Sequence, residues 1–285
     1  VIYPPPQRDR VAAVKAIPGV KSTTSFGLAF EHLDFNVKKP GLDDVAVRKA
    51  IASGLDIDSM LRRTVGQFSD KAQVLGNRIY VNNQKEYQDN RGAYGKGDAT
   101  AAKKLLTDAG YAAGADGIFA KNGKKLSFRF STTAGNALRE TQGELFKAQM
   151  KLIGIDIKID NSAADVLFGK RLPAGDFDIA DFAWVATPFA TSNKSIYSTG
   201  GGQNYGKFSS PAVDAAFNDA VALLDESKRT AKFNDIDKLL WDEMATIPLY
   251  QKPTFIAFSD KYANIVDNAS STGPFWNVGE WGLKK

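Results

Sequence analysis

Cysteine is absent from the 285 residues, and histidine occurs once, at His32. The lack of cysteine excludes disulfides, zinc ribbons, thiol catalysis and iron–sulfur ligation, but it does not fix the compartment, because oxidising and reducing compartments both tolerate it. A single histidine excludes metal sites built from several histidines and leaves one residue for a Ser/His/Asp triad. His32 lies beside Glu31 in an expected strand, where a structural role is the default. We therefore expect no metal and no cofactor.

Long apolar runs are also missing, and none approaches the roughly 20 residues that span a membrane. The sequence shows no signal peptide and does not begin with methionine. Its first residues, Val1-Ile2-Tyr3, resemble the inside of a buried strand. We therefore expect the chain to start within a longer protein.

Charge of either sign is dispersed. There are 37 Lys+Arg against 32 Asp+Glu, which gives a net charge of +5, and basic pairs such as Lys38-Lys39 and Arg62-Arg63 are scattered. A nucleic-acid surface requires positive charge clustered on one face, so we expect no nucleic-acid partner. The composition supports a packed core, and the length alone suggests about two domains.

The hydrophobic pattern alternates between strand and helix periods, which is typical of an α/β fold. The expected helix starts are Asp43 or Asp44, Asp56, Asp98, Asn136 and Ser210, with further helices before Pro18-Gly19 and through Phe233, Ile236, Leu240 and Met244. The expected strands cover 20–26, 28–36, 126–131, 155–159, 177–184 and 255–258, and residues 64–97 are expected to wrap the surface as a long loop. Leu152, Val221 and Leu224 are assigned to buried stripes, and Phe275, Trp276 and Trp281 are expected to pack.

Two motifs suggest chemistry but lack essential parts. Residues 201–208 nearly form a phosphate-binding loop, but Phe208 replaces the hydroxyl residue and Pro211 delays the helix. We interpret this segment as a glycine loop that lets the backbone approach another group closely, a ligand among the options. Asp176, Asp178 and Asp181 suggest a glycosidase, but the first two share one strand face and the third lies opposite, so they do not converge.

Aromatic and amide side chains crowd residues 182–205, among Thr, Ser and Gly. Such a mixture suits a pocket that holds a polar and partly apolar ligand without reacting with it. The alternative, for Trp184 and Phe182, is a simple core position. The predicted ligand-binding residues are Trp184, Thr187, Phe189, Asn193, Gln203, Asn204 and Tyr205.

Seven segments occur in an order that resembles one known family. They are 31–36 (EHLDFN), 44–51 with Asp56, 98–106 continued by 109–111, 153–157, 175–178 with Trp184, 204–205, and 247–250 (IPLY). This order is similar to that of the family-5 extracellular solute-binding proteins of oligopeptide and dipeptide ABC importers. The resemblance covers nearly the whole chain.

The resemblance implies an α/β, type-II periplasmic-binding-protein-like fold with one complete lobe plus parts of the other lobe. Residues 1–36 would belong to the first lobe, 37–250 would form the second, ligand-binding lobe, and 251–285 would return to the first. The strands crossing near 36–40 and 250–253 would then form the hinge, and their prolines fit that position.

One departure from the family pattern bears on the ligand. Peptide-binding members often have an acidic residue shortly after the strand tryptophan, where it pairs with the peptide amino terminus. Here Trp184 is followed by Val-Ala-Thr-Pro-Phe, without a carboxylate. A buried ammonium without a partner costs several kcal/mol, so free dipeptides are disfavoured. Oligopeptides held by backbone bonds, modified peptides, sugars and glycolipid headgroups stay open.

The resulting prediction is a non-enzymatic protein that binds a peptide-like or other polar solute between two lobes and delivers it to the permease of an ABC importer. It would act at the extracellular face of the membrane or in the periplasm, attached to the membrane only by a lipid anchor outside this chain. An envelope protein that binds glycolipid, carbohydrate or another protein is the alternative. A carbohydrate hydrolase is the weaker one.

Overall fold

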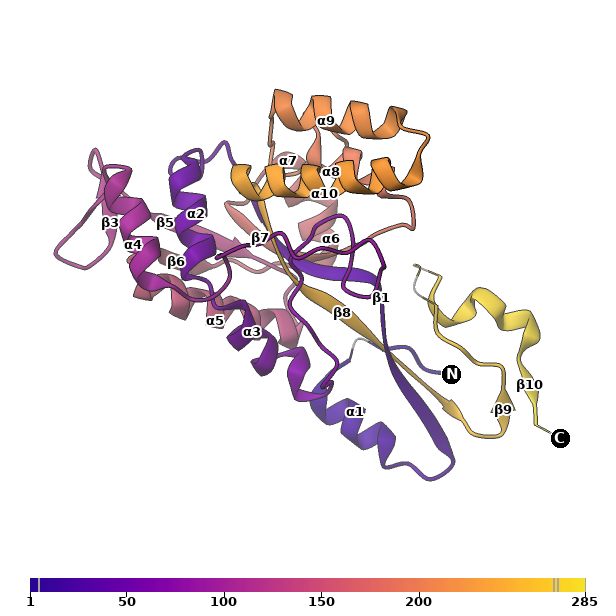
Figure 1. Cartoon of the computed structure of the whole chain (residues 1–285). Helices are drawn as coiled ribbons and strands as arrows, with labels where there is room; N and C mark the ends of the chain where they lie inside the picture. Colours follow the sequence, from indigo (N-terminus) through magenta and orange to yellow (C-terminus); the bar gives the residue numbers. More distant parts are fainter. Residues whose placement is uncertain (5, 269, 271, 285) are drawn as a thin grey trace.

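A mixed five-stranded sheet forms the centre of the molecule (Figure 1). The computed structural model describes residues 1–4, 6–268, 270 and 272–284. The strand order is β6-β5-β7-β1-β8, in which β5, β6 and β7 are parallel and β1 is antiparallel to both of its neighbours. These strands are β1 (Val20–Phe35), β5 (Ser127–Ser131), β6 (Asp156–Ile159), β7 (Ile179–Val185) and β8 (Thr246–Ser259). The expected α/β class is confirmed.

Strands β1 and β8 are much longer than their neighbours and leave the sheet together as a two-stranded ribbon. Residues 29–35 of β1 pair with β7, whereas 20–26 pair only with 253–259 of β8. The register shifts between Phe26 and Phe30, which marks the transition. The sequence predicts two separate strands at 20–26 and 28–36, and the structure joins them because Gly27 stays extended within one ladder.

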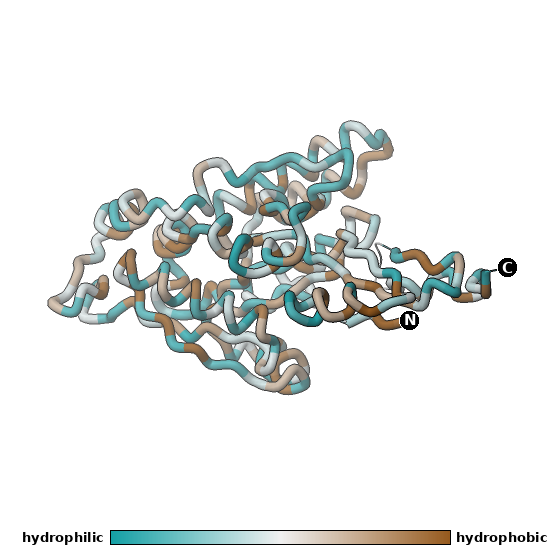
Figure 2. Tube along the Cα trace, turned by 90° about the horizontal axis from the view of Figure 1, so that it is seen from below, coloured by the Kyte–Doolittle hydropathy of each residue, from teal (hydrophilic) through white to brown (hydrophobic). Residues whose placement is uncertain are grey.

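Both ends of the chain pack beside this ribbon. Helix α1 (Arg8–Lys15) buries Val11 against Phe255 and Ala257, and Ile2 forms an isolated bridge to Ala257. At the other end, β9 (Tyr262–Ala263) pairs with β10 (Gly282–Leu283) around the 3-10 segment η4 (Gly273–Glu280). Figure 2 shows hydrophobic residues extending into this narrow end.

One face of the sheet, the α5 face, is covered by helices that the sequence predicts well. They are α2 (Val45–Gly54), α3 (Ile57–Arg63), α4 (Ala99–Asp108) and α5 (Ala137–Leu152). Each starts at a capping side chain that accepts a backbone N–H, namely Asp44, Asp56, Asp98 and Asn136. Phe146 of α5 packs on Phe130 of β5, with ring centres 5.2 Å apart.

The opposite face, the α7 face, carries α6 (Ala164–Val166), the π-helical turn η2 (Leu167–Arg171) and α7 (Leu172–Ala174). Leu167 and Leu172 bury Phe182 of β7 there. A second core joins α8 (Lys194–Tyr197), α9 (Pro211–Ala222) and α10 (Glu226–Glu243). The remaining short elements are η1 (Val65–Gln67), β2 (Ala112–Ala113), β3 (Phe119–Lys121), β4 (Lys124–Lys125) and η3 (Ala190–Asn193).

The segment 64–97 corrects one prediction, since its centre is buried rather than wrapped around the surface. Arg78 is almost fully buried, 3.2 Å from Asp237, with its guanidinium 4.2 Å from the Trp241 ring centre. Leu75 packs beside Phe30. The segment lacks a hydrophobic period because, beyond the short turn η1, it is held by this polar network and by irregularly spaced apolar contacts.

Several apolar side chains are exposed where burial was expected. Leu224 is 95% exposed, just beyond α9, and Leu152 and Val221 also face outward because neighbouring residues fill the buried faces of their helices. Phe275 and Trp276 are about half exposed. The Trp281 ring packs beside Phe275, with ring centres 5.7 Å apart. Val1, Ile2 and Tyr3 are further exposed residues of this kind.

Candidate functional site

The end of β7 presents an aromatic cluster on the α7 face. The Trp184 ring lies parallel to Tyr205, with centres 5.9 Å apart, and to His32, with centres 5.7 Å apart. Phe182 meets the edge of both Trp184 and His32. Phe182 and His32 are direct cross-strand partners, as are Trp184 and Phe30, so the β1–β7 register builds the cluster.

His32 is buried within this cluster, as expected for a structural residue. Its Nε2 lies 3.2 Å from Asp34 Oδ1. Neither ring nitrogen makes a well-aligned hydrogen bond to the described residues, and the same is true of Trp184 Nε1. Packing rather than hydrogen bonding therefore holds the imidazole.

The predicted site residues divide into three groups. Trp184 and Tyr205 meet in the aromatic cluster. Thr187 and Phe189 lie in the exposed loop after β7, where Thr187 Oγ1 is 3.0 Å from Ser192 Oγ and Phe189 is 71% exposed. Phe189 also lines a pocket of about 320 Å³ beside α10.

The third group consists of amide side chains that form hydrogen bonds within their own loop region. Asn193 donates to Ala190 O, and Gln203 Oε1 accepts from Ser195 Oγ. Asn204 donates to Ser198 O and Phe208 O and accepts from Phe208 N, so its side chain is fully used by the glycine loop. The side chains of this third group are thus bonded within their own loops, and the ligand-binding role of the seven residues stays a prediction.

The glycine loop makes two close backbone approaches, as its composition indicates. A Cβ on Gly206 would lie 2.4 Å from Phe35 O, and one on Gly201 would lie 2.3 Å from Ser195 O. The loop therefore packs against the end of β1 and against α8. The described residues also contain no group of three His, Asp or Glu that could hold a metal ion, and none of their helices is long and apolar enough to cross a membrane.

A pocket that the sequence did not reveal lies where the β1–β8 ribbon leaves the sheet. We call it the crossing pocket, and its volume is about 270 Å³. Its described lining residues are Tyr3, Pro4, Pro6, Gly27, Ala29, Ala183, Val185, Lys252, Pro253, Thr254, Phe255, Asn268 and Ser270. Ala183 and Val185 alternate with Trp184, so the pocket opens on the other side of β7 from the aromatic cluster.

Beside this pocket lies the buried charge cluster, which consists of Glu31, Arg139, Asp181 and Lys252. Arg139 donates two hydrogen bonds to Glu31, from Nε to Oε2 at 3.1 Å and from Nη2 to Oε1 at 3.2 Å. Lys252 Nζ lies 3.4 Å from Oε1 of the same carboxylate. Asp181 Oδ1 accepts from Gln142 at 3.4 Å, and its Oδ2 has no partner among the described residues. The cluster joins β1, β7 and β8 to α5.

The pKa values of the two acids shift in opposite directions. Burial alone would raise the pKa of Glu31, but Arg139 and Lys252 bring that pKa below its usual value. Burial and the nearby Glu31 carboxylate raise the pKa of Asp181 well above its usual range. Glu31 is therefore held ionised, and Asp181 is favoured in its neutral form.

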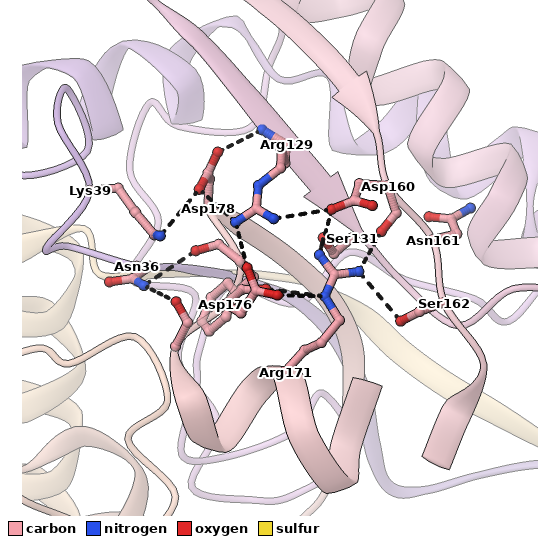
Figure 3. Close-up of polar contacts among 12 residues, drawn as sticks. Asn36, Lys39, Arg129, Ser131, Asp160, Asn161, Ser162, Arg171, Asp176 and Asp178 are labelled. Carbon is pink, nitrogen blue, oxygen red and sulfur yellow. Dashed lines mark hydrogen bonds and ion pairs between the residues drawn. The ribbon is translucent and has the colours of Figure 1, made fainter. Parts of the chain in front are cut away.

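A second group of charges, the surface ion network, lies near the other edge of the sheet on the α7 face (Figure 3). It consists of Lys39, Arg129, Asp160, Arg171, Asp176 and Asp178. Arg129 Nη2 lies 3.0 Å from Asp176 and 3.4 Å from Asp178. A hydrogen bond from Arg129 lowers the pKa of Asp176.

The aspartates considered for a glycosidase do not converge. Asp178 contacts Arg129 on the α7 face, whereas Asp181 contacts Gln142 of α5 on the other face. Glu31 and Asp181 do share a face, but both are fully buried and Glu31 is bound by Arg139. Neither arrangement offers two accessible carboxylates to one glycosidic bond.

The sequence profile of the bacterial extracellular solute-binding proteins, family 5 Middle, matches residues 1–207. This chain belongs to family 5. The resemblance inferred from the seven motifs is confirmed.

Oligopeptide-binding proteins match most of the chain. The oligopeptide-binding protein OppA of Mycobacterium tuberculosis is 29% identical over 259 residues, which cover 90% of this chain and 43% of that protein. The oligopeptide-binding protein AppA of Bacillus subtilis is 24% identical over 275 residues, covering 93% and 49%. The chain therefore spans a little under half the length of these two relatives.

Solved structures place the fold in the same group. The periplasmic EDTA-binding protein EppA matches 99% of this chain and 54% of its own, with a TM-score of 0.93 and 24% identity. The oligopeptide-binding protein of Thermus thermophilus, complexed with a pentapeptide, matches 95% and 50%, with a TM-score of 0.77 and 25% identity. The expected periplasmic-binding-protein fold, present in part, is confirmed.

Proposed function

We propose that the complete protein binds a peptide-like or other polar solute, without transforming it, and delivers it to an ABC importer. Family membership and the oligopeptide-binding relatives support the class of function. The observation that carries the proposal for this chain is the crossing pocket. Its walls combine the N-terminal segment, the 253–270 region and the end of β7.

The lobes of this proposal meet at the β1–β8 ribbon. The family resemblance implies boundaries at 36/37 and 250/251. Because residues 29–35 pair with β7 inside the main sheet, we propose a first boundary slightly earlier and a second slightly later in the chain. We therefore assign the hinge to the register shift near Gly27 and Pro253. The segments beyond it would belong to the first lobe, and the crossing pocket would lie between the lobes, where such proteins bind ligand.

The loop after Trp184 fits a ligand other than a free dipeptide. Thr187 is exposed and bonded to Ser192, and it supplies no charge for a peptide ammonium. A longer peptide places its ammonium elsewhere and is held mainly by backbone hydrogen bonds. A glycolipid or carbohydrate is the alternative, favoured by the exposed ring of Phe189.

The site of action follows from the family, whose members are extracellular solute-binding proteins. We propose that the ligand closes the two lobes and that the closed form docks on the permease. A lipid anchor outside this chain would hold the protein at the membrane. The solute would be released unchanged.

Equilibrium dialysis of the complete protein against peptides of two to nine residues, read by mass spectrometry, tests the proposal. Wild-type protein should retain peptides longer than two residues, with unchanged masses. Ala183→Leu fills the crossing pocket and should abolish retention, whereas Ala113→Leu, on the exposed strand β2, should not. Loss of retention in Trp184→Ala would extend the site to the aromatic cluster.

Two results would contradict the proposal. Retention by Ala183→Leu equal to that of wild type would remove the crossing pocket from the site. Failure to retain any peptide, with capture of envelope glycolipid instead, would replace peptide binding by the alternative function.

A further inference from the structure

The crossing pocket has one charged side chain among its described lining residues, Lys252. The other lining groups are aliphatic, aromatic or neutral and polar. The Lys252 side chain is 28% exposed and lines the pocket, while its Nζ lies 3.4 Å from Glu31 Oε1. The side chain is therefore shared between the pocket and the buried Glu31 carboxylate.

The protein itself does not balance this charge. Lys252 and Arg139 share the single carboxylate of Glu31, and Arg139 makes the closer, two-point contact. Within the described part of the chain, Lys252 Nζ has this one ion pair, although an ammonium carries three donors. Two cations against one ionised acid leave one positive charge beside the pocket, since Asp181 is favoured neutral.

Another acid near the pocket is already engaged. Asp267 accepts a hydrogen bond from Thr254, which lines the wall, and its other oxygen accepts from the Asn268 backbone. Asp267 does not itself line the pocket. Asp267 is therefore not a counter-ion for Lys252.

We propose that Lys252 binds a carboxylate of the ligand at the floor of the crossing pocket. This inference rests on the proposed function and narrows it to solutes with an acidic group. The pocket volume of about 270 Å³ is slightly below the roughly 300–1,000 Å³ that enclose a drug-sized molecule, so it holds one end or one side chain of a longer ligand. The ligand class is thus a peptide whose C-terminal carboxylate, or an acidic side chain, enters between Ala29, Ala183 and Phe255.

The test compares matched probes on the complete protein by calorimetry. A peptide retained in the dialysis experiment is measured as the free acid and as its C-terminal amide, and any Glu in it is exchanged for Gln. One of these neutralisations should weaken binding about tenfold or more, the effect of losing a charge-assisted hydrogen bond. If the C-terminal amide binds more weakly than the free acid, the C-terminal carboxylate reaches Lys252. If the Gln peptide binds more weakly than the Glu peptide, the side-chain carboxylate does.

Variants connect the effect to the residue. Lys252→Met should bind the acid and the neutral probe equally, and Lys252→Arg should restore the preference. Lys158→Met, on the exposed face of β6, is the matched control and should keep the wild-type ratio. The comparison of probes on wild-type protein needs no variant, so it holds even where Lys252→Met folds poorly.

The outcomes separate this inference from the proposed function. Peptides that bind equally as acid, amide and Gln forms to wild-type protein would overturn the role of Lys252 and leave peptide binding intact. A preference that persists in Lys252→Met would also overturn it. Failure to bind any peptide would contradict the proposed function itself.

Discussion

The two groups of charges on the central sheet differ in exposure and in balance. The surface ion network sets three cations against three carboxylates, and its Asp176 is 56% exposed. The buried charge cluster has two cations, one ionised acid and one acid favoured neutral, all on the α5 face. A balanced network of exposed ion pairs links neighbouring elements with little desolvation. A buried excess of one charge carries a large desolvation penalty unless a group of opposite charge binds to it.

Removing the central cation of the buried cluster should have the largest effect. Arg139→Met leaves Glu31 buried with only Lys252, and loss of one partner of a buried pair costs about 3–5 kcal/mol. Urea unfolding followed by circular dichroism measures the loss. The double variant Glu31→Gln/Arg139→Met should recover part of it, because no ionised acid remains. A loss below about 1 kcal/mol for the single variant would contradict the buried pairing.

The pH dependence of stability separates the two acids of the cluster. The pKa of Asp181 is raised on folding, so its stabilising contribution is complete below the unfolded pKa and is lost as pH rises towards the folded one. Asp181→Asn mimics the neutral form and should remove this loss, up to about 1.4 kcal/mol per pH unit. Its stability relative to wild type should therefore increase from pH 5 to pH 8.

Unfolding curves at several pH values within that range make the measurement. Asp165→Asn, at an aspartate with an exposed side chain in α6, is the control and should stay parallel to wild type. An Asp181→Asn curve parallel to wild type would mean that Asp181 is not held neutral.

The smallest effect is expected in the surface ion network. Asp176→Asn should cost about 0.2–1 kcal/mol, because an exposed ion pair gains little over its solvated groups. Wild type and variant should converge in 1 M NaCl, where charges are screened within about 3 Å. Thermal unfolding at low and high salt measures this. A loss above 2 kcal/mol that persists in salt would place Asp176 among the buried pairs.

Local features of this fold were predictable from the sequence, because their causes lie within a few residues. Asp44, Asp56, Asp98 and Asn136 cap helices as expected, each bonding an N–H two or three residues ahead. Ser210 does the same before Pro211. The alternation of Ile155, Ile157 and Ile159 likewise indicated β6.

The crossing pocket and the buried charge cluster were not predictable, because their members are far apart in the sequence. Glu31 meets Arg139 across 108 residues, and Ala29 and Ala183 come together only through the β1–β7 pairing. Nothing in a strand that reads Glu31-His32 distinguishes a solvated acid from a buried one. Of the seven predicted ligand-binding residues, Trp184 and Tyr205 stack on the other side of β7 from this pocket, and the role of all seven stays a prediction.

The register shift between Phe26 and Phe30 also has a mechanical consequence. Beyond it the ribbon consists of two strands tied to each other, so neither can bend without the other. A paired ribbon is stiff within the plane of its ladder and compliant across it. In the two-lobed protein proposed above, flexing would be confined to one axis, with the irregular step, where the ladder is interrupted, as the pivot. Such a joint would restrict the relative motion of the lobes to opening and closing along one direction.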